Sequence, residues 1–163
     1  MSQITVRSVT YQLDGQSYES RLAFDADHKG PRPGLLMAPN WMGVSAGAEE
    51  IAKSVAAKGY VVLIADLYGQ SVRPQNGDEA GAAMMPLKND RALLRKRMQA
   101  AFEQLQGQGE AAVDTSKLAT FGFCFGGCCA LEFARTGAPV KAAVSFHGTL
   151  DTPNVNDAKT IKG

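Results

Sequence analysis

Apolar and polar residues alternate in the first part of the chain. The alternation covers residues 4–10 and 17–24, and Asp14-Gly15 lies between these two segments. Alternation is typical of strands that bury one face, and Asp-Gly is a favoured two-residue hairpin turn. The pattern predicts an N-terminal β-hairpin.

Further along the chain, short apolar runs replace the alternation. Such runs are typical of strands buried on both faces, as in a parallel sheet. Segments with apolar residues at helical spacing separate the runs. The expected strands are residues 34–38, 60–65, 118–123 and 140–146, and the expected helices are residues 45–59, 87–105 and 126–135. This order predicts an α/β fold with a doubly wound, mainly parallel sheet and helices on both faces.

Two segments have no regular pattern. Residues 68–81 contain Gly, Pro and Asn, and we expect them to form a surface loop. Residues 151–163 are polar, and we expect no helix or strand there.

The composition is that of an ordinary soluble protein of one domain. The 163 residues suffice for a sizeable core, and 45% of them are hydrophobic. Seventeen Lys and Arg residues nearly balance sixteen Asp and Glu residues, so the net charge of +1 attracts neither nucleic acid nor a membrane. No apolar run has the length of a membrane span, and the N-terminus lacks a secretion signal. We therefore expect a cytoplasmic protein without nucleic-acid or membrane partners.

The three cysteines lie within six residues of one another. So local a group cannot form a disulfide framework, and free thiols indicate a reducing compartment. The two histidines, His28 and His147, do not lie at zinc-ligand spacing from Cys124, Cys128 and Cys129. We expect neither a metal nor a cofactor, and we interpret Cys128 and Cys129 as small buried hydrophobic residues.

Cys124 lies in a segment that is typical of a nucleophile elbow. The segment Gly122-Phe123-Cys124-Phe125-Gly126-Gly127 follows an expected strand and opens an expected helix. The turn is so sharp that side chains two positions either side of the nucleophile would collide, which explains Gly122 and Gly126. Amide dipoles at the helix N-terminus favour a thiolate, and the Phe125 amide faces the place where an oxyanion would form.

Two other interpretations of this segment are available. In the first, the glycines serve packing alone and Cys124 is filler in an ordinary strand–helix turn. The segment also resembles a dinucleotide-binding turn, whose second glycine lets the backbone approach pyrophosphate. Cys124 occupies that position, and its side chain would obstruct the approach, which disfavours nucleotide binding.

The sequence resembles the dienelactone hydrolase family, a branch of the α/β-hydrolases that uses cysteine. The matching segments are the elbow, Gly59-Tyr60 leading to Ala65-Asp66-Leu67-Tyr68, and Pro39-Asn40-Trp41-Met42-Gly43-Val44. The resemblance implies that Cys124 attacks a small ester or lactone to give an acyl-enzyme. It also implies that the amides of Phe125 and Trp41 form the oxyanion hole. Asn40 stands where members of the family have a Glu that contacts the resting thiol, and it would line the pocket.

The resemblance also implies that part of the fold is absent from this sequence. The Asp and His of the family's triad follow later strands, so we expect residues 1–163 to be the N-terminal portion of an α/β-hydrolase domain. The chain would then lack the last strands and helices and expose a sheet edge through which it associates. His147, after the strand at 140–146, is a candidate base or pocket residue.

Several roles remain open at this level. A non-catalytic or redox-responsive thiol module would use Cys124 with Cys128, and acyl or thioester transfer is an alternative to hydrolysis. Asp66 is expected to cap a turn rather than act as an acid. Arg73 and Arg91 are candidates for binding a substrate carboxylate.

Overall fold

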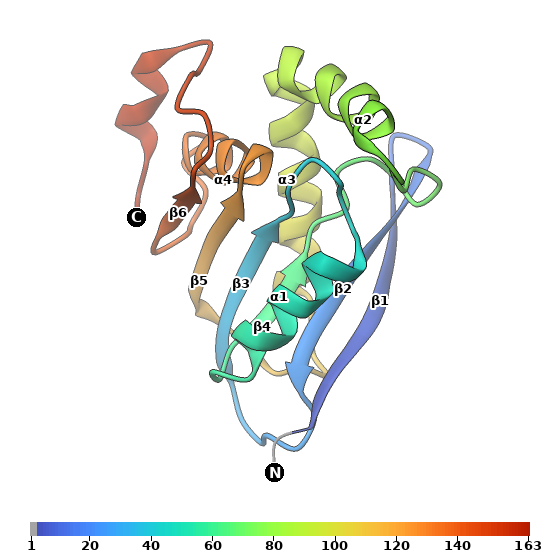
Figure 1. The fold of residues 1–163 in the computed structure, drawn as a ribbon. Coiled ribbons are helices and arrows are strands. Elements are labelled where there is room, and N and C mark those ends of the chain that lie inside the picture. Colours follow the sequence, from blue (N-terminus) through green and yellow to red (C-terminus); the bar gives the residue numbers. More distant parts are fainter. Residues whose placement is uncertain (1–2) are drawn as a thin grey trace.

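The computed structural model describes residues 3–163 as a single six-stranded sheet flanked by helices (Figure 1). The strands are β1 (Ile4–Leu13), β2 (Gln16–Asp25), β3 (Arg32–Ala38), β4 (Val61–Ile64), β5 (Val113–Phe123) and β6 (Ala143–Phe146). The helices are α1 (Ala46–Ala56), α2 (Gly77–Asn89), α3 (Arg91–Gln106), α4 (Phe125–Ala134) and the short 3₁₀ helix η1 (Val155–Thr160).

The sheet has the strand order β1-β2-β4-β3-β5-β6. β1 pairs with β2 and β2 with β4 in antiparallel fashion, whereas β3, β4, β5 and β6 run parallel to one another. Asp14 and Gly15 join the hairpin with φ angles of 51° and 75°, as a two-residue turn of the mirror-image class requires. The predicted hairpin, the mainly parallel sheet and the α/β class are therefore confirmed.

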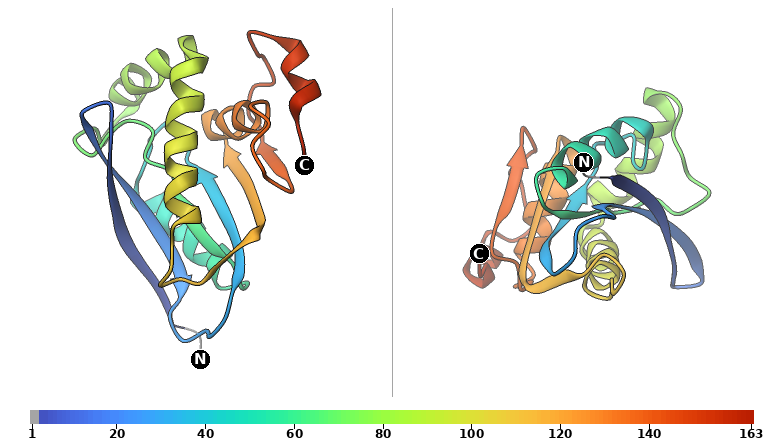
Figure 2. Two further views of the ribbon diagram at one scale, coloured as in Figure 1. Left: turned by 180° about the vertical axis from the view of Figure 1, so that it is seen from behind. Right: turned by 90° about the horizontal axis from the view of Figure 1, so that it is seen from below.

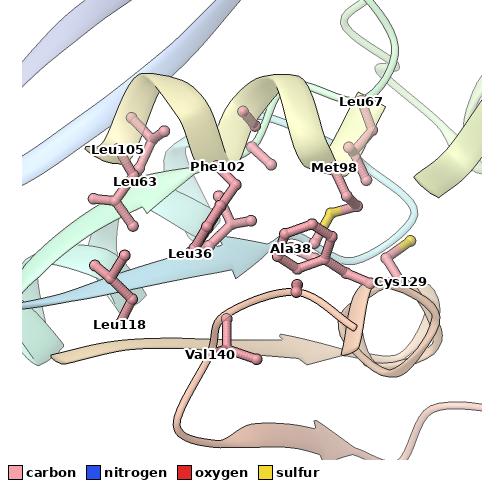
Figure 3. Close-up of a cluster of buried hydrophobic side chains, with 14 of the residues drawn as sticks. Leu36, Ala38, Leu63, Leu67, Met98, Phe102, Leu105, Leu118, Cys129 and Val140 are labelled. Carbon is pink, nitrogen blue, oxygen red and sulfur yellow. The ribbon is translucent and has the colours of Figure 1, made fainter. Parts of the chain in front are cut away.

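Helices cover both faces of this sheet (Figure 2). On one face α1 buries Ala48, Ala52 and Ala56 against sheet residues. On the other face α3 and α4 pack beside each other, with the rings of Phe102 and Phe133 5.1 Å apart. Figure 3 shows this second core, in which α3 side chains lie on Leu36, Leu63 and their neighbours from the sheet. The apolar runs of β3 and β4 are thus buried from both sides, whereas Val144 and Phe146 of β6 are exposed.

The segment before α3 differs from the prediction. Part of the expected loop at residues 68–81 and the start of the expected helix at 87–105 form α2, and the helix breaks at Asp90. The Asn76 side chain accepts a hydrogen bond from the Glu79 amide at 3.0 Å, and Asp90 does the same for Leu93 at 3.0 Å. Each side chain caps a helix N-terminus and satisfies an amide that has no partner in the helix. Two caps therefore divide one expected helix into two.

The C-terminal segment also contains an element that the sequence pattern did not indicate, the helix η1. Ion pairs attach this segment to α3: Arg95 pairs with Asp157 at 2.7 Å and with Glu132 of α4 at 2.8 Å. Glu132 is completely buried and also pairs with Arg135 at 2.8 Å. A buried carboxylate needs such partners, so the charges of residues far apart in sequence hold the segment in place.

Asp66 connects the end of β4 with β2. It is 1% exposed, and its Oδ1 accepts hydrogen bonds from the amides of Tyr68 at 3.2 Å and Gly69 at 3.0 Å. Its Oδ2 accepts from the Glu19 amide at 2.9 Å and from Arg73 at 3.2 Å. The expected capping role of Asp66 is confirmed.

The structure has no membrane-spanning candidate among the helices of residues 3–163, since none is both long and apolar enough.

Replacement of Asp66 by Ala should lower the free energy of unfolding by about 3 kcal/mol, because buried amides lose their acceptor. Urea unfolding followed by circular dichroism measures the change. Asp27→Ala is the matched control, since Asp27 is exposed and its carboxylate forms no hydrogen bond in the described part of the chain. Equal stability of both variants would contradict the structural role of Asp66.

Candidate active site

Cys124 lies in a strained turn between β5 and α4. Its φ of 55° and ψ of −121° are a conformation that residues with a side chain rarely adopt, and it is typical of a nucleophile elbow. The Cys124 amide donates to the Phe146 carbonyl of β6 at 3.0 Å. The Cys124 carbonyl accepts from the Gly127 amide at 3.0 Å. Hydrogen bonds of its amide and its carbonyl thus stabilise the strained backbone conformation. The residue Cys124 remains exposed.

The glycines of the elbow allow backbone segments to touch. A Cβ on Gly122 would collide with the backbone of Gly126, and a Cβ on Gly126 would collide with the carbonyl oxygens of Ala38 and Pro39. The steric need for these glycines agrees with the sequence interpretation. Gly126 also allows the elbow to contact the end of β3. The sequence alone did not indicate this second contact.

A cavity of about 260 Å³ opens beside Cys124. It lies at the carboxyl edge of the parallel strands, where α/β folds commonly bind ligands. The lining residues are Trp41, Met84, Lys88, Cys124, Phe125, His147 and Thr149. Four of them, Trp41, Cys124, Phe125 and His147, were predicted from the sequence, whereas Met84 and Lys88 belong to α2, which was read in part as a loop. The cap at Asn76 was the signal that would have placed Met84 on a helix, whereas Lys88 already lay in the expected helix at 87–105.

Two residues that line this cavity have a backbone amide without a protein partner in the described part of the chain. Among residues 3–163, neither the Trp41 amide nor the Phe125 amide has a hydrogen-bond acceptor. The Phe125 amide is the first of α4, where helical amides lack partners and favour negative charge. The Trp41 amide lies in the loop that follows β3. The indole of Trp41 is 38% exposed and approaches Gly77, so it is a wall of the cavity rather than a buried plug.

Asn40 does not line this cavity. Its Oδ1 accepts a hydrogen bond from the Met42 amide at 2.9 Å, and its carbonyl accepts from the Gly43 amide at 2.9 Å. Asn40 borders a separate depression beside the start of α1, together with Met42 and Ser45. In this structure the residue shapes the turn that carries Trp41.

His147 directly follows β6 and lines the cavity. It has a φ of 47°, is exposed, and lies with its ring 6.4 Å from that of Phe123. Within the described residues its imidazole forms no hydrogen bond to Cys124. The arrangement places an imidazole at the wall of the cavity without coupling it to the thiol.

The dienelactone hydrolase family model matches residues 20–163. This chain belongs to the dienelactone hydrolase family. It is 32% identical over 151 residues to a Bradyrhizobium protein named probable 2-oxo-3-(5-oxofuran-2-ylidene)propanoate lactonase. That match covers 90% of this chain and 59% of the relative.

Solved structures of the same family have the same fold. A dienelactone hydrolase-like promiscuous phosphotriesterase from metagenomic libraries superposes with a TM-score of 0.90 at 37% identity, covering 98% of this chain and 65% of that one. A dienelactone hydrolase from Anabaena variabilis has a TM-score of 0.65 at 22% identity, covering 90% of this chain and 64% of that one, and agrees in fold. This chain therefore spans less than two thirds of the length of these relatives.

The other two thiols of this dienelactone hydrolase family member have different surroundings. Cys129 is completely buried in the core, as predicted, and burial raises the pKa of its thiol well above the ordinary value. Cys128 is buried too, but its sulfur accepts a hydrogen bond from Arg91 at 2.6 Å. The predicted burial of Cys128 is therefore confirmed, and the structure adds a polar contact that the sequence did not indicate.

Neither arginine that was a candidate for substrate binding lines the cavity. Arg91 is 7% exposed and pairs with Asp151 at 2.7 Å. Arg73 donates to the carbonyls of Gly69 at 2.8 Å and Glu19 at 3.1 Å. Both guanidinium groups serve internal contacts.

Replacement of Gly122 by Ala should destabilise the fold by more than about 3 kcal/mol, because the added methyl group meets backbone that cannot move aside. Gly81→Ala is the matched control, since a Cβ at Gly81 in α2 meets open space. The control should raise the free energy of unfolding by about 0.5–1 kcal/mol, because a helical alanine replaces glycine. Urea unfolding of both variants measures the difference, and a Gly122→Ala variant as stable as the wild type would contradict the steric constraint.

Proposed function

We propose that this chain carries the nucleophile and oxyanion hole of a hydrolase for small esters or lactones. The observation that carries the proposal is the exposed Cys124 at the elbow, in one cavity with the unpaired amides of Trp41 and Phe125. Membership of the dienelactone hydrolase family supports the same reaction class.

In the proposed mechanism, the Cys124 thiolate attacks the carbonyl carbon and a C–S bond forms. Negative charge moves to the carbonyl oxygen, where the Trp41 and Phe125 amides donate hydrogen bonds. The tetrahedral intermediate collapses, the C–O bond to the alkoxide breaks, and a thioester remains on Cys124. The alkoxide takes up one proton. Water then attacks the thioester, giving up one proton as the carboxylic acid leaves and the thiolate is restored.

Lys88 suggests which substrates this cavity favours. Its side chain lines the cavity together with the apolar residues Trp41, Met84 and Phe125. Among the described residues, its ammonium group forms no ion pair or hydrogen bond. A substrate with a carboxylate would supply the missing partner. The Bradyrhizobium relative carries a propanoate in the name of its substrate, and we propose a carboxylate-bearing ester or lactone for this chain as well.

Reaction of the 163-residue chain with p-nitrophenyl acetate tests the nucleophile. We expect release of one equivalent of p-nitrophenolate and one acetyl group on Cys124, located by intact-mass and peptide-mass measurement. Cys124→Ala should abolish the adduct, whereas Cys128→Ser should retain it. An acetyl group on the Cys124→Ala variant would overturn the assignment. Reversible oxidation of Cys124 with Cys128, without any acyl adduct, would favour the redox-responsive thiol module instead.

Replacement of Lys88 by Gln should slow acylation by an ester that bears a carboxylate, such as mono-p-nitrophenyl succinate, by about fivefold, the effect of about 1 kcal/mol from one partly exposed charge pair. Acylation by neutral p-nitrophenyl butyrate should not change. Lys58→Gln serves as a control, because Lys58 is an exposed lysine away from the cavity. An equal effect of Lys88→Gln on both esters would contradict charge recognition.

A further inference from the structure

Tyr68 contacts the loop that carries the Trp41 amide. Its hydroxyl donates a hydrogen bond to the Trp41 carbonyl at 2.8 Å. Tyr68 follows β4 and Trp41 follows β3, so the bond joins the loops after two neighbouring parallel strands. The Tyr68 side chain is only 5% exposed.

The ring of Tyr68 also fits against Gly43 at the other end of the same loop. Gly43 has a φ of +71°, and a Cβ there would lie 2.9 Å and 3.0 Å from two ring carbons of Tyr68. The Asn40 side chain closes the turn from within by accepting from the Met42 amide. The loop is thus held from inside by Asn40 and from outside by Tyr68.

Tyr68 is itself fixed at both ends of its backbone. Its amide donates to Asp66 at 3.2 Å, and its carbonyl accepts from the Gln16 side chain at 3.0 Å. Asp66 is bonded in turn to β2 through the Glu19 amide. A rigid chain of contacts therefore leads from the hairpin to the Trp41 loop.

We propose that Tyr68 is a positioning residue that directs the Trp41 amide toward the oxyanion. The inference rests on the proposed function, in which that amide stabilises the tetrahedral intermediate. The hydroxyl fixes the carbonyl of Trp41, and with it the peptide plane that follows Trp41. Asn40 holds the same turn through the Met42 and Gly43 amides, so the backbone on both sides of Trp41 is restrained and the direction of its amide with it. An oxyanion-hole donor acts only when it lies within hydrogen-bond distance of the developing charge.

The hydroxyl of Tyr68 remains a donor in the presence of a thiolate. Burial raises the pKa of Tyr68 above its ordinary range, and a thiolate at Cys124 acts in the same direction. Tyr68 therefore stays protonated when Cys124 is ionised, and the bond to Trp41 persists in the reactive state.

The test compares two reactions of Cys124 in the 163-residue chain. Acylation by p-nitrophenyl acetate passes through an oxyanion, whereas alkylation by iodoacetamide does not. We expect Tyr68→Phe to slow acylation by roughly tenfold to a hundredfold, somewhat less than the loss of a whole oxyanion-hole donor. The alkylation rate should change by less than about twofold, since nothing in that reaction needs the oxyanion hole.

Two further variants guard against a general structural effect. Tyr11→Phe removes a hydroxyl that contacts Ser20 on the hairpin, and both reactions should proceed as in the wild type. Gly43→Ala strains the Trp41 loop directly, because Gly43 has a φ of +71°; it should slow acylation without slowing alkylation, which shows that the two reactions report on the loop.

The outcomes separate this inference from the proposed function. If the wild type is acylated on Cys124 and Tyr68→Phe reacts equally fast, Tyr68 has no positioning role, while the nucleophile assignment stands. A parallel fall of acylation and alkylation also overturns the inference, because it indicates a disturbed elbow. If the wild type forms no acyl adduct at all, both the proposed function and this inference fail.

Discussion

The close approach of two backbone segments determines the arrangement of this edge of the sheet. The elbow after β5 presses against the end of β3, and the absence of side chains at Gly122 and Gly126 makes the contact fit. Parallel pairing of the two strands already places their carboxyl ends side by side. The contact then brings the first turn of α4 next to the loop of Trp41, so that a thiol and two amides share one cavity. A larger residue at either glycine would separate these groups.

Most polar side chains around this contact form internal hydrogen bonds and ion pairs that stabilise the fold. Asp66, Arg73 and Arg91 have the charges that a catalytic or substrate-binding role would use, but each is engaged by internal partners. Their burial makes such bonds necessary, because an unpaired buried charge is costly. Among residues 3–163, the groups of the cavity lining that are not engaged in this way include the exposed Cys124 thiol, the His147 imidazole and the Lys88 ammonium group. The cavity therefore combines few polar groups with a wide apolar wall, as small-molecule sites usually do.

Local patterns were sufficient to predict most of the fold and the elbow. The turn at Asp14 and the spacing around Cys124 are signals contained in a few consecutive residues. The start of α2 was missed because the Gly, Pro and Asn residues at 68–81 indicated a loop, and the cap at Asn76 was not recognised. Lys88 lay within the expected helix at 87–105, but nothing in the local pattern indicated that it lines a cavity with Cys124. The partners of Arg91 could not be predicted, since Cys128 and Asp151 lie 37 and 60 residues away along the chain.

The surroundings of the three thiols bear on the choice between acyl chemistry and redox chemistry. A disulfide between Cys124 and Cys128 would bond the sulfur that accepts from Arg91 to a second sulfur, which makes it a weaker acceptor. The Arg91 side chain is 7% exposed, so the weakened contact lies in a place where water cannot easily replace it. The guanidinium group also lies beside the buried Glu132 at 3.8 Å, whose own pairing depends on the same cluster of charges. Oxidation thus works against the packing of α4, whereas acylation of Cys124 leaves Cys128 and Arg91 undisturbed. This difference favours Cys124 as a nucleophile acting alone.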